Sequence, residues 1–437
     1  DALPDSGHFR PAGEGIQERG GMMRACPHFT ENRDGRSGKL FAVFVGCIVA
    51  VYLLAGCGEG SDNDGKINLE ALPQVEPREI LSFDSVGSRY FEFIYQKTIP
   101  MEDGSVILGD LSQSPFILRI YSAGTGEGVF NMREDGTNPE SAGLGTDWGN
   151  LDDVRAELIA SAGRGPGEIQ DITSINRDQH GNLYVYDQMN NRVSRYLKGK
   201  IYDDEFTPET MEGHSLAEVY PMAGDGDYLK RYMSMDYLYN PDSKPEVTLS
   251  SFNARSNEYS KRLTLPVQLR AILRQEGGMS AYAVPFTPDQ LIAVNPVRNS
   301  FMLYWPASGE ITEMSPAMDT LRTIPVRLSE EELNSADRDS VENRFQRFDQ
   351  PELQRIVQDL LPEYKTPVDR FLIDNQARFW LKLTHRSATQ RWLVLNPEGL
   401  PQKVVHFPEN AVITHVSDKH VGAVVDHFIF TLYEPVE

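Results

Sequence analysis

A glycine-rich stretch at residues 163–168 (GRGPGE) is the first place in this sequence where residue types and spacing could support chemistry. Such loops can hold a phosphate on their backbone N–H groups when they lead into a helix N-terminus. This stretch lacks the Gly-Lys-Ser/Thr ending of a phosphate loop, and a β-rich run follows it, so no helix dipole faces it. We therefore predict a surface connector. Its candidate ligand-binding residues are Arg164, Glu168 and Asp171.

Two other patterns approximate catalytic motifs. Residues 213–217 (GHSLA) resemble a nucleophile elbow, but no strand-to-helix pattern surrounds them. The histidines near the C-terminus show neither an H-E-x-x-H motif nor a paired-ligand spacing. They are His406, His415, His420 and His427. We interpret these residues as strand and turn positions, and we predict no catalytic residue.

The residues that must position the connector form one supersecondary unit, residues 163–196. After the connector we expect an extended run at 172–177, a tight turn, a β-rich run at 183–186, a polar turn and a third run ending at Tyr196. Three short strands bury too little apolar surface to fold alone. The unit therefore needs similar units to pack against.

Weaker copies of this unit recur along the chain. In the first copy, Gly104 and Asp110 correspond to Gly181 and Asp187 of the strong unit, which suits turns with positive φ and self-capping carboxylates. The five copies span residues 103–121, 225–252, 287–309, 372–399 and 416–433. Six similar units favour a closed radial array, a β-propeller. The last unit is one strand short, and residues 78–84 (REILSFD) could complete it and remove an exposed sheet edge.

Two segments interrupt the repeats. Residues 329–361 place N-cap residues at Ser329 and Asp349, a Pro at 351, and apolar residues at helical spacing, which predicts a two-helix insertion between the fourth and fifth units. We expect its apolar face to pack against the ring. Residues 122–153 are rich in Gly and poor in apolar residues, which predicts a surface excursion.

Charge and cysteine content narrow the function classes. The 437-residue chain has a formal net charge of -22, which repels phosphate backbones and argues against a nucleic-acid partner. An acidic surface favours solubility and can also hold divalent cations. No cysteine follows Cys57, so the body has no disulfide, thiol nucleophile or thiolate metal site.

The N-terminal region carries an address signal. An uncharged apolar run at residues 40–55 follows basic residues, as in an export signal, and is short for a membrane span. It ends in LAGC, which resembles the bacterial lipobox with Cys57 as the lipidated residue. An uncleaved anchor and a buried helix are the alternatives for this apolar run.

We expect an upstream extension (1–21), a lipoprotein signal peptide (22–56), a flexible tether (57–74) and a propeller (75–437). In many Gram-negative bacteria, an Asp directly after the lipidated cysteine retains a lipoprotein at the inner membrane. This chain has Gly58 at that position, so we expect the outer membrane.

The strong unit also resembles a known repeat. Residues 163–168, Asp178 with 181–185 (GNLYV), and Asp187 with 190–193 (NNRV) resemble one NHL-type repeat of the six-bladed, NHL/TolB-like β-propeller superfamily. Residues 362–374 and 421–433 are similar to the later blades of six-bladed propeller lipoproteins, which are largely of unassigned function. The resemblance implies an all-β fold and an envelope address but no chemistry.

The resemblance also raises the question of a metal. Related gluconolactonase-type propellers hold a divalent metal over the central channel with acidic and amide side chains from several blades. The resemblance implies four candidate positions for such ligands in this chain, Glu168, Asp171, Asp178 and Asp374. No motif here matches those ligands residue by residue, and these carboxylates equally suit turn caps.

We therefore expect a monomeric, six-bladed propeller anchored through Cys57, acting as a binding scaffold for an envelope protein, peptide or glycan and using no cofactor. The alternative is a metal-dependent lactonase-like or other hydrolytic enzyme with its site in the central channel. The two differ in whether three or more carboxylate or amide groups from different blades converge at one channel mouth.

Overall fold

Every described residue belongs to one compact unit, Glu59–Glu437. The computed structural model describes residues 65–122, 154–222, 227–240, 243–253, 258–275, 278–295, 297–384 and 389–436. The predicted extension, signal peptide and Cys57 lie outside these residues, and so does the predicted excursion apart from Ser122. Among the described residues, no helix is long and apolar enough to cross a membrane.

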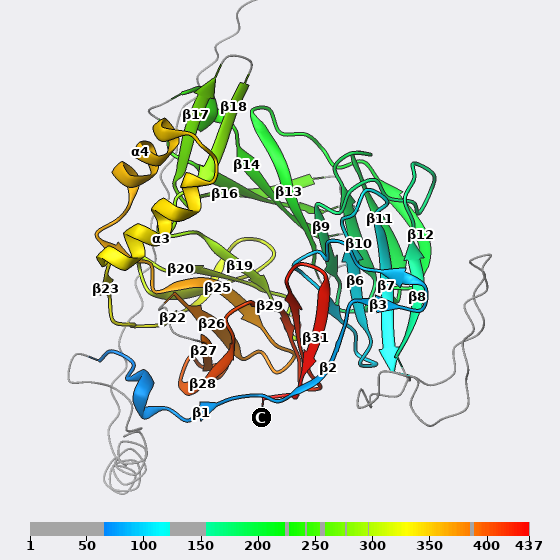
Figure 1. The fold of residues 1–437 in the computed structure, drawn as a ribbon. Helices are drawn as coiled ribbons and strands as arrows, with labels where there is room; N and C mark the ends of the chain where they lie inside the picture. Colours follow the sequence, from blue (N-terminus) through cyan, green and yellow to red (C-terminus); the bar gives the residue numbers. More distant parts are fainter. Residues whose placement is uncertain are drawn as a thin grey trace, which may run out of the picture. The chain divides into compact units, whose positions relative to one another are not determined.

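Six sheets with at least four strands each follow one another along the chain, which makes the body an all-β, six-bladed propeller. Figure 1 shows them as a ring, from β6 to β8 in cyan through green and orange to β29 and β31 in red. Within each blade, strands that follow one another along the chain pair in antiparallel fashion; the two pairings made by the N-terminal strands β1 and β2 are described below. The predicted fold class is confirmed.

The first three blades contain twelve strands. The first blade contains β5 (Ile99–Pro100), β6 (Val106–Asp110), β7 (Phe116–Ser122) and β8 (Val154–Ala160). The second contains β9 (Ser174–Arg177), β10 (Leu183–Asp187), β11 (Arg192–Leu197) and β12 (Ile201–Phe206). The third contains β13 (His214–Pro221), β14 (Asp227–Ser234), β15 (Glu246–Asn253) and β16 (Glu258–Pro266).

The last three blades follow the same plan. The fourth contains β19 (Leu291–Val294), β20 (Phe301–Trp305), β21 (Glu310–Met314) and β22 (Thr320–Pro325). The fifth contains β25 (Val368–Ile373), β26 (Phe379–Leu383), β27 (Thr389–Leu395) and β28 (Pro401–Pro408). The sixth contains β29 (Ala411–Val416), β30 (Val421–Val425) and β31 (Ile429–Tyr433), and it is completed by β2 (Glu79–Phe83).

The ring closes where the N-terminal strand β2 pairs with the C-terminal strand β31. The pairing is antiparallel, with Ser82 opposite Thr431 and Phe83 opposite Phe430. It confirms the predicted role of residues 78–84. A further strand, β1 (Gln74–Val75), pairs in parallel with β28, so the segment before β2 also follows the rim of the fifth blade.

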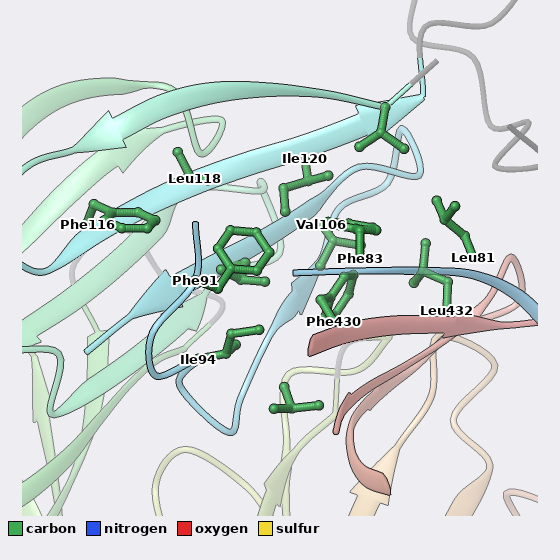
Figure 2. Packing of buried hydrophobic residues seen from close by; sticks show 13 residues of the cluster. Leu81, Phe83, Phe91, Ile94, Val106, Phe116, Leu118, Ile120, Phe430 and Leu432 are labelled. Atoms are coloured by element: carbon green, nitrogen blue, oxygen red, sulfur yellow. The ribbon is translucent and has the colours of Figure 1, made fainter. Parts of the chain in front are cut away.

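A hydrophobic cluster supports this closure, and Figure 2 shows its side chains. Phe83 of β2 and Phe430 of β31 meet edge to face at 5.7 Å between ring centroids. They pack in one cluster with Val106 of β6 and Leu118 of β7, which belong to the first blade. The apolar contact therefore joins the last blade to the first, and the termini are held by packing as well as by strand pairing.

The carboxylates at the ends of equivalent strands perform the same structural task in the first two blades. Asp110, at the end of β6, accepts hydrogen bonds from the backbone N–H of Glu92 and Phe93. Asp187, at the end of β10, accepts one from Gln170. Each carboxylate thus ties the end of the second strand to the segment that leads into the innermost strand. The predicted correspondence between the two aspartates has a physical basis.

The helical insertion contains α3 (Ser335–Gln346) and α4 (Pro351–Leu360), between the fourth and fifth blades as predicted. Its start was predicted wrongly at Ser329. Asn334 is the N-cap and forms a capping box with Asp337. The preceding residues instead form β23 (Glu331–Glu332), which pairs with β24 (Tyr364–Lys365). Lys365 explains the difference, because its ammonium contacts both Glu331 and Asp337 and fixes the strand to the helix.

The apolar face of the insertion packs on a hairpin that was not predicted. This hairpin is β17 (Arg270–Gln275) and β18 (Gly278–Ala283), between the third and fourth blades, and Figure 1 shows α3 and α4 beside it. The cluster includes Leu273 from the hairpin with Val341, Phe345, Leu353 and Val357 from the helices. The insertion therefore forms a satellite layer with its own small core.

The remaining elements are short. They are η1 (Leu69–Ala71), β3 (Ser85–Val86), β4 (Arg89–Tyr90) and α2 (Asp236–Tyr239).

Candidate functional site

The innermost strands of all six blades enclose one cavity of about 380 Å³. We call it the central cavity. Its lining includes residues from β5, β9, β13, β19, β25 and β29. Several lining residues follow these strands within two positions, among them Glu102, Asp178, Met222, Asn295 and Asn375. The cavity therefore lies toward the carboxyl ends of the innermost strands.

The charge of the central cavity is opposite to that of the whole chain. Four basic residues line it, namely Lys97, Arg177, Arg298 and Arg370. Two acidic residues line it, Glu102 and Asp178. Because the chain as a whole carries a net charge of -22, this local excess of cations is a specific feature of the cavity. A cavity walled by protein of low dielectric increases the effect of such charges on a ligand.

One carboxylate neutralises part of this charge. Glu218 of β13 lies 3.5 Å from the ammonium of Lys97 and 3.6 Å from the guanidinium of Arg231. It also accepts a hydrogen bond from the hydroxyl of Tyr220. Burial alone would raise the pKa of Glu218, but Lys97, Arg231 and Tyr220 outweigh it and lower the pKa. Glu218 is therefore ionised, and it forms ion pairs with Lys97 and Arg231.

Two guanidinium groups in the cavity wall have no such partner. Arg370 of β25 donates to the carbonyl oxygen of Gln96 at 2.8 Å, while the adjacent Asp369 pairs with Lys382 instead. Arg177 makes no ion pair with any carboxylate that the structure describes, although Glu102 and Asp178 are near enough to act on its pKa. Burial lowers the pKa of both arginines below the ordinary value for arginine, but a guanidinium stays charged in a protein.

The wall also contains a buried amide that lacks an acceptor. The Oδ1 atom of Asn295 accepts from the backbone N–H groups of Val297 and Arg298, at 2.9 and 3.1 Å. These bonds fix the amide orientation and leave Nδ2 as a donor. Asn295 is 3% exposed, and its Nδ2 has no hydrogen-bond acceptor in the described part of the chain. A buried donor without a partner costs about 1–3 kcal/mol, so such groups call for a specific explanation.

A histidine completes the wall on the side of the sixth blade. His415 of β29 contacts the hydroxyl of Thr98 through Nδ1, and Thr98 lies 2.7 Å from the hydroxyl of Thr414. Burial lowers the pKa of His415 well below 6.5, with smaller effects from His420 and from Arg177. At neutral pH this ring is uncharged. It therefore adds a polar surface to the cavity but no charge.

The predicted ligand-binding residues lie on the connector that precedes β9, and none of them lines the central cavity. Arg164 is exposed. The carboxylate of Glu168 accepts from the backbone N–H of Gly165 at 2.7 Å, and that of Asp171 accepts from the hydroxyl of Thr173 at 2.7 Å. Because the connector precedes an innermost strand, it lies toward the amino ends of these strands. A ligand contact at these residues stays a prediction.

The carboxylates considered for a metal have structural partners. Asp178 accepts from the backbone N–H of His180 and Asn182 and so caps its turn. Asp374 is fully buried and accepts from Arg378 at 2.6 Å and from the indole of Trp380 at 3.0 Å. Across the described ranges, no three His, Cys, Asp or Glu side chains are grouped closely enough to hold a metal ion.

The remaining candidate motifs have ordinary structural surroundings. Residues 214–217 belong to β13, so the elbow-like pattern lies within a strand. His406 contacts Gln74 and Thr389, and His427 stacks on Phe93. His420 meets the ring of His415 edge on at 5.0 Å.

Arg177, Arg370 and Asn295 were not predicted as site residues from the sequence. Arg177 ends β9, Arg370 lies within β25, and Asn295 directly follows β19, so the three lie on different blades. No local motif joins them. The one available signal was a charged residue within a run that should form an innermost strand, as at Arg177 and Arg370.

Comparisons with known proteins show little sequence similarity. No protein-family model matches this chain, and no curated protein matches it. Among solved structures, the chain is similar to a DUF4221 family member from Bacteroides vulgatus, with a TM-score of 0.43 and 10% identity, covering 82% of this chain and 96% of that one. It is similar to a putative exported protein from Bacteroides fragilis, with a TM-score of 0.43 and 11% identity, covering 83% and 99%.

A third similar structure is a gluconolactonase from Xanthomonas campestris, with a TM-score of 0.33 and 10% identity, covering 79% of this chain and 87% of that one. Likenesses at these TM-scores carry no argument about activity. The six-bladed architecture rests on the strand pairing described above.

Proposed function

We propose that this chain is a binding propeller whose ligand enters the central cavity. The observation that carries the proposal is the wall of the cavity, to which the innermost strands of all six blades contribute. A cavity of about 380 Å³ falls within the range of small-molecule sites, which is roughly 300–1,000 Å³. It suits a small ligand or the end of a peptide or glycan chain.

The closed ring favours binding because its wall is formed in advance. Pairing of β2 with β31 and the hydrophobic cluster beneath it join the last blade to the first. Side chains held on paired strands lose little freedom when a ligand binds, so less of the interaction energy is spent on ordering them. The propeller would thus act as a rigid receptor.

We further propose that a lipid at Cys57 holds the body in the cell envelope, as a lipoprotein of the outer membrane with NHL-like blades. The apolar run at residues 40–55 and the LAGC sequence support this part of the proposal. The partner would be an envelope protein, peptide or glycan. Mass spectrometry of the mature N-terminus tests it, since a chain that keeps the residues before Cys57 without modification would rule out the anchor.

Blocking the cavity mouth tests the ligand site. Asn299 is exposed and lines the cavity, so Asn299→Trp should narrow the entrance. The matched control is Asn240→Trp, because Asn240 is exposed and lies outside the cavity lining. Wild type and control should capture the same component from envelope extracts, and Asn299→Trp should not. Equal capture by all three would place binding elsewhere, and Arg164→Ala would then test the connector.

The metal-dependent alternative has its own test. A divalent ion that binds the folded chain stabilises it in proportion to the logarithm of its concentration above Kd. We expect calcium to leave the melting temperature unchanged, because Asp178 and Asp374 already accept hydrogen bonds from protein groups. A calcium-dependent rise would support the hydrolytic alternative.

A further inference from the structure

We infer that the central cavity recognises an oxyanion, a carboxylate or phosphate on a small acidic ligand, through Arg177 and Arg370. This inference rests on the proposed function and names the ligand chemistry of that site. The ligand would bring its anionic group between the two guanidinium groups and offer an acceptor to Asn295.

The placement of the two arginines supports this geometry. Arg177 ends the innermost strand of the second blade, and Arg370 lies on the innermost strand of the fifth. In a ring of six blades, the second and fifth are opposite each other. Both side chains line the same cavity. They therefore approach a ligand from opposite walls.

Charge balance within the cavity also points to an anion. Lys97 and Arg231 share the carboxylate of Glu218, and Arg298 lies 3.8 Å from Glu313. Arg177 and Arg370 form no ion pair of this kind among the described residues. Glu102 and Asp178 act on Arg177, and Asp369 acts on Arg370, only without such a contact, so both charges are compensated in part. Uncompensated charge in a partly buried site costs free energy. An anionic ligand would remove that cost.

The unpaired amide of Asn295 is a second and independent observation. Its Nδ2 atom is a buried donor without an acceptor in the described ranges, and Asn295 belongs to the wall of the cavity. Like the guanidinium groups, it requires an acceptor. A ligand rich in oxygen acceptors satisfies both kinds of group, whereas an apolar ligand would leave them unsatisfied.

Thermal shift and calorimetric titration of the purified full chain test the inference. The probes are D-glucuronate, glucose 6-phosphate and D-glucose, compared at equal ionic strength. At least one of the two acidic probes should stabilise the chain and bind with a measurable Kd, and neutral glucose should bind at least tenfold more weakly. The acidic probe that binds more tightly shows whether the cavity prefers a carboxylate or a phosphate. Equal binding of glucose and both acidic probes would overturn the inference, as would no binding of either acid.

Charge-removing variants locate the anion. Arg177→Gln and Arg370→Gln should each weaken the binding of the acidic probe by about tenfold or more, which is the loss in affinity typical of a charge-assisted hydrogen bond. Arg338→Gln is the matched control, because Arg338 is exposed on α3 and its substitution removes the same charge. If Arg370→Gln does not fold, Arg370→Lys keeps the charge but not the planar fork and should bind with intermediate affinity. Unchanged affinity in the folded cavity variants would contradict the inference.

The outcomes separate the two levels of the proposal. If Asn299→Trp abolishes capture of the envelope component while neither acidic probe binds, the cavity remains the ligand site and the oxyanion inference is wrong. If Asn299→Trp captures that component as well as wild type does, the proposed function is wrong.

Discussion

The guanidinium of Arg370, on the innermost strand of the fifth blade, donates to the carbonyl oxygen of Gln96 at 2.8 Å, in the segment that leads into the first blade. The sixth blade lies between these two blades in the ring, so the contact joins blades that are not neighbours. It fixes the position of a partly buried cation without pairing its charge with a carboxylate. A side chain kept charged and oriented in this way is suited to meet a ligand.

Replacing Arg370 by Met should therefore change stability little. The variant loses one hydrogen bond, worth about 0.5–1.5 kcal/mol, but it also removes a partly buried charge that has no carboxylate partner. We expect the free energy of unfolding in urea to change by about 1 kcal/mol or less. Arg378→Met is the contrasting variant, because it leaves the buried Asp374 uncompensated and should cost about 3–5 kcal/mol. Equal losses in both variants would show that Arg370 is a structural residue.

The ring closure should depend on Phe430. This side chain is fully buried and packs with β2 and with the first blade, so Phe430→Ala should reduce the free energy of unfolding by about 3–5 kcal/mol. Phe428, in the same hairpin, is 39% exposed and provides the control, with an expected cost of about 1 kcal/mol. Similar costs at both positions in a denaturation experiment would argue against closure by packing.

The approach of His415 to the backbone of β30 should make Gly422 intolerant of substitution. A Cβ atom at this position would lie 2.1 Å from Cε1 of His415. Because His415 is buried against Thr98, it has little room to move, and Gly422→Ala should cost about 1–3 kcal/mol.

Gly278→Ala is the matched control, since a Cβ there meets nothing within 4 Å. The double variant Gly422→Ala with His415→Ser should recover part of the loss, because the smaller side chain relieves the clash. Strict additivity of the two substitutions in thermal melts would contradict this explanation.

Acid should destabilise the sixth blade through His420. Burial, assisted by Lys419, lowers the pKa of this ring from 6.5 to about 4. Between these values the unfolded chain binds a proton that the folded chain does not, so stability falls as the pH decreases from 6.5 toward 4. Above this range the group contributes no pH dependence. The loss from this ring is on the order of 3 kcal/mol.

The variant His420→Gln should therefore have a flatter profile of unfolding free energy against pH over this range. His180→Gln is the matched control, because it makes the same replacement at an exposed position. An unaltered slope in His420→Gln would show that other groups govern the acid response.

Much of the architecture is encoded locally. The turn glycines at 104 and 181 adopt positive φ, as the spacing predicts, and Asp110 and Asp187 bind the backbone at equivalent points of their blades. Alternation of apolar residues and turn residues acts over a few positions, so it can be recognised without knowing the rest of the fold. The closing strand was predictable for a similar reason, since one unit lacked a strand and an unassigned β-rich segment was available.

Other parts of the fold depended on contacts that local patterns do not contain. The helix starts at Ser335 and not at the predicted Ser329, because Lys365 pairs with both Glu331 and Asp337. These ion pairs hold Glu331 in a strand and Asp337 at the helix N-terminus. The hairpin β17–β18 has no partner strands in a blade, and its apolar residues are covered by the helical insertion. Long-range packing decided both features.

The sequence by itself determined that this chain forms six repeated units of short strands and turns and closes them with an N-terminal strand, because turn chemistry and strand periodicity are local properties. The tertiary structure alone decided which side chains form the candidate site. Arg177, Asn295 and Arg370 belong to three different blades and share no motif, and only closure of the ring brings them to one cavity. Their significance lies in their partners and their burial, which depend on how the whole ring is assembled.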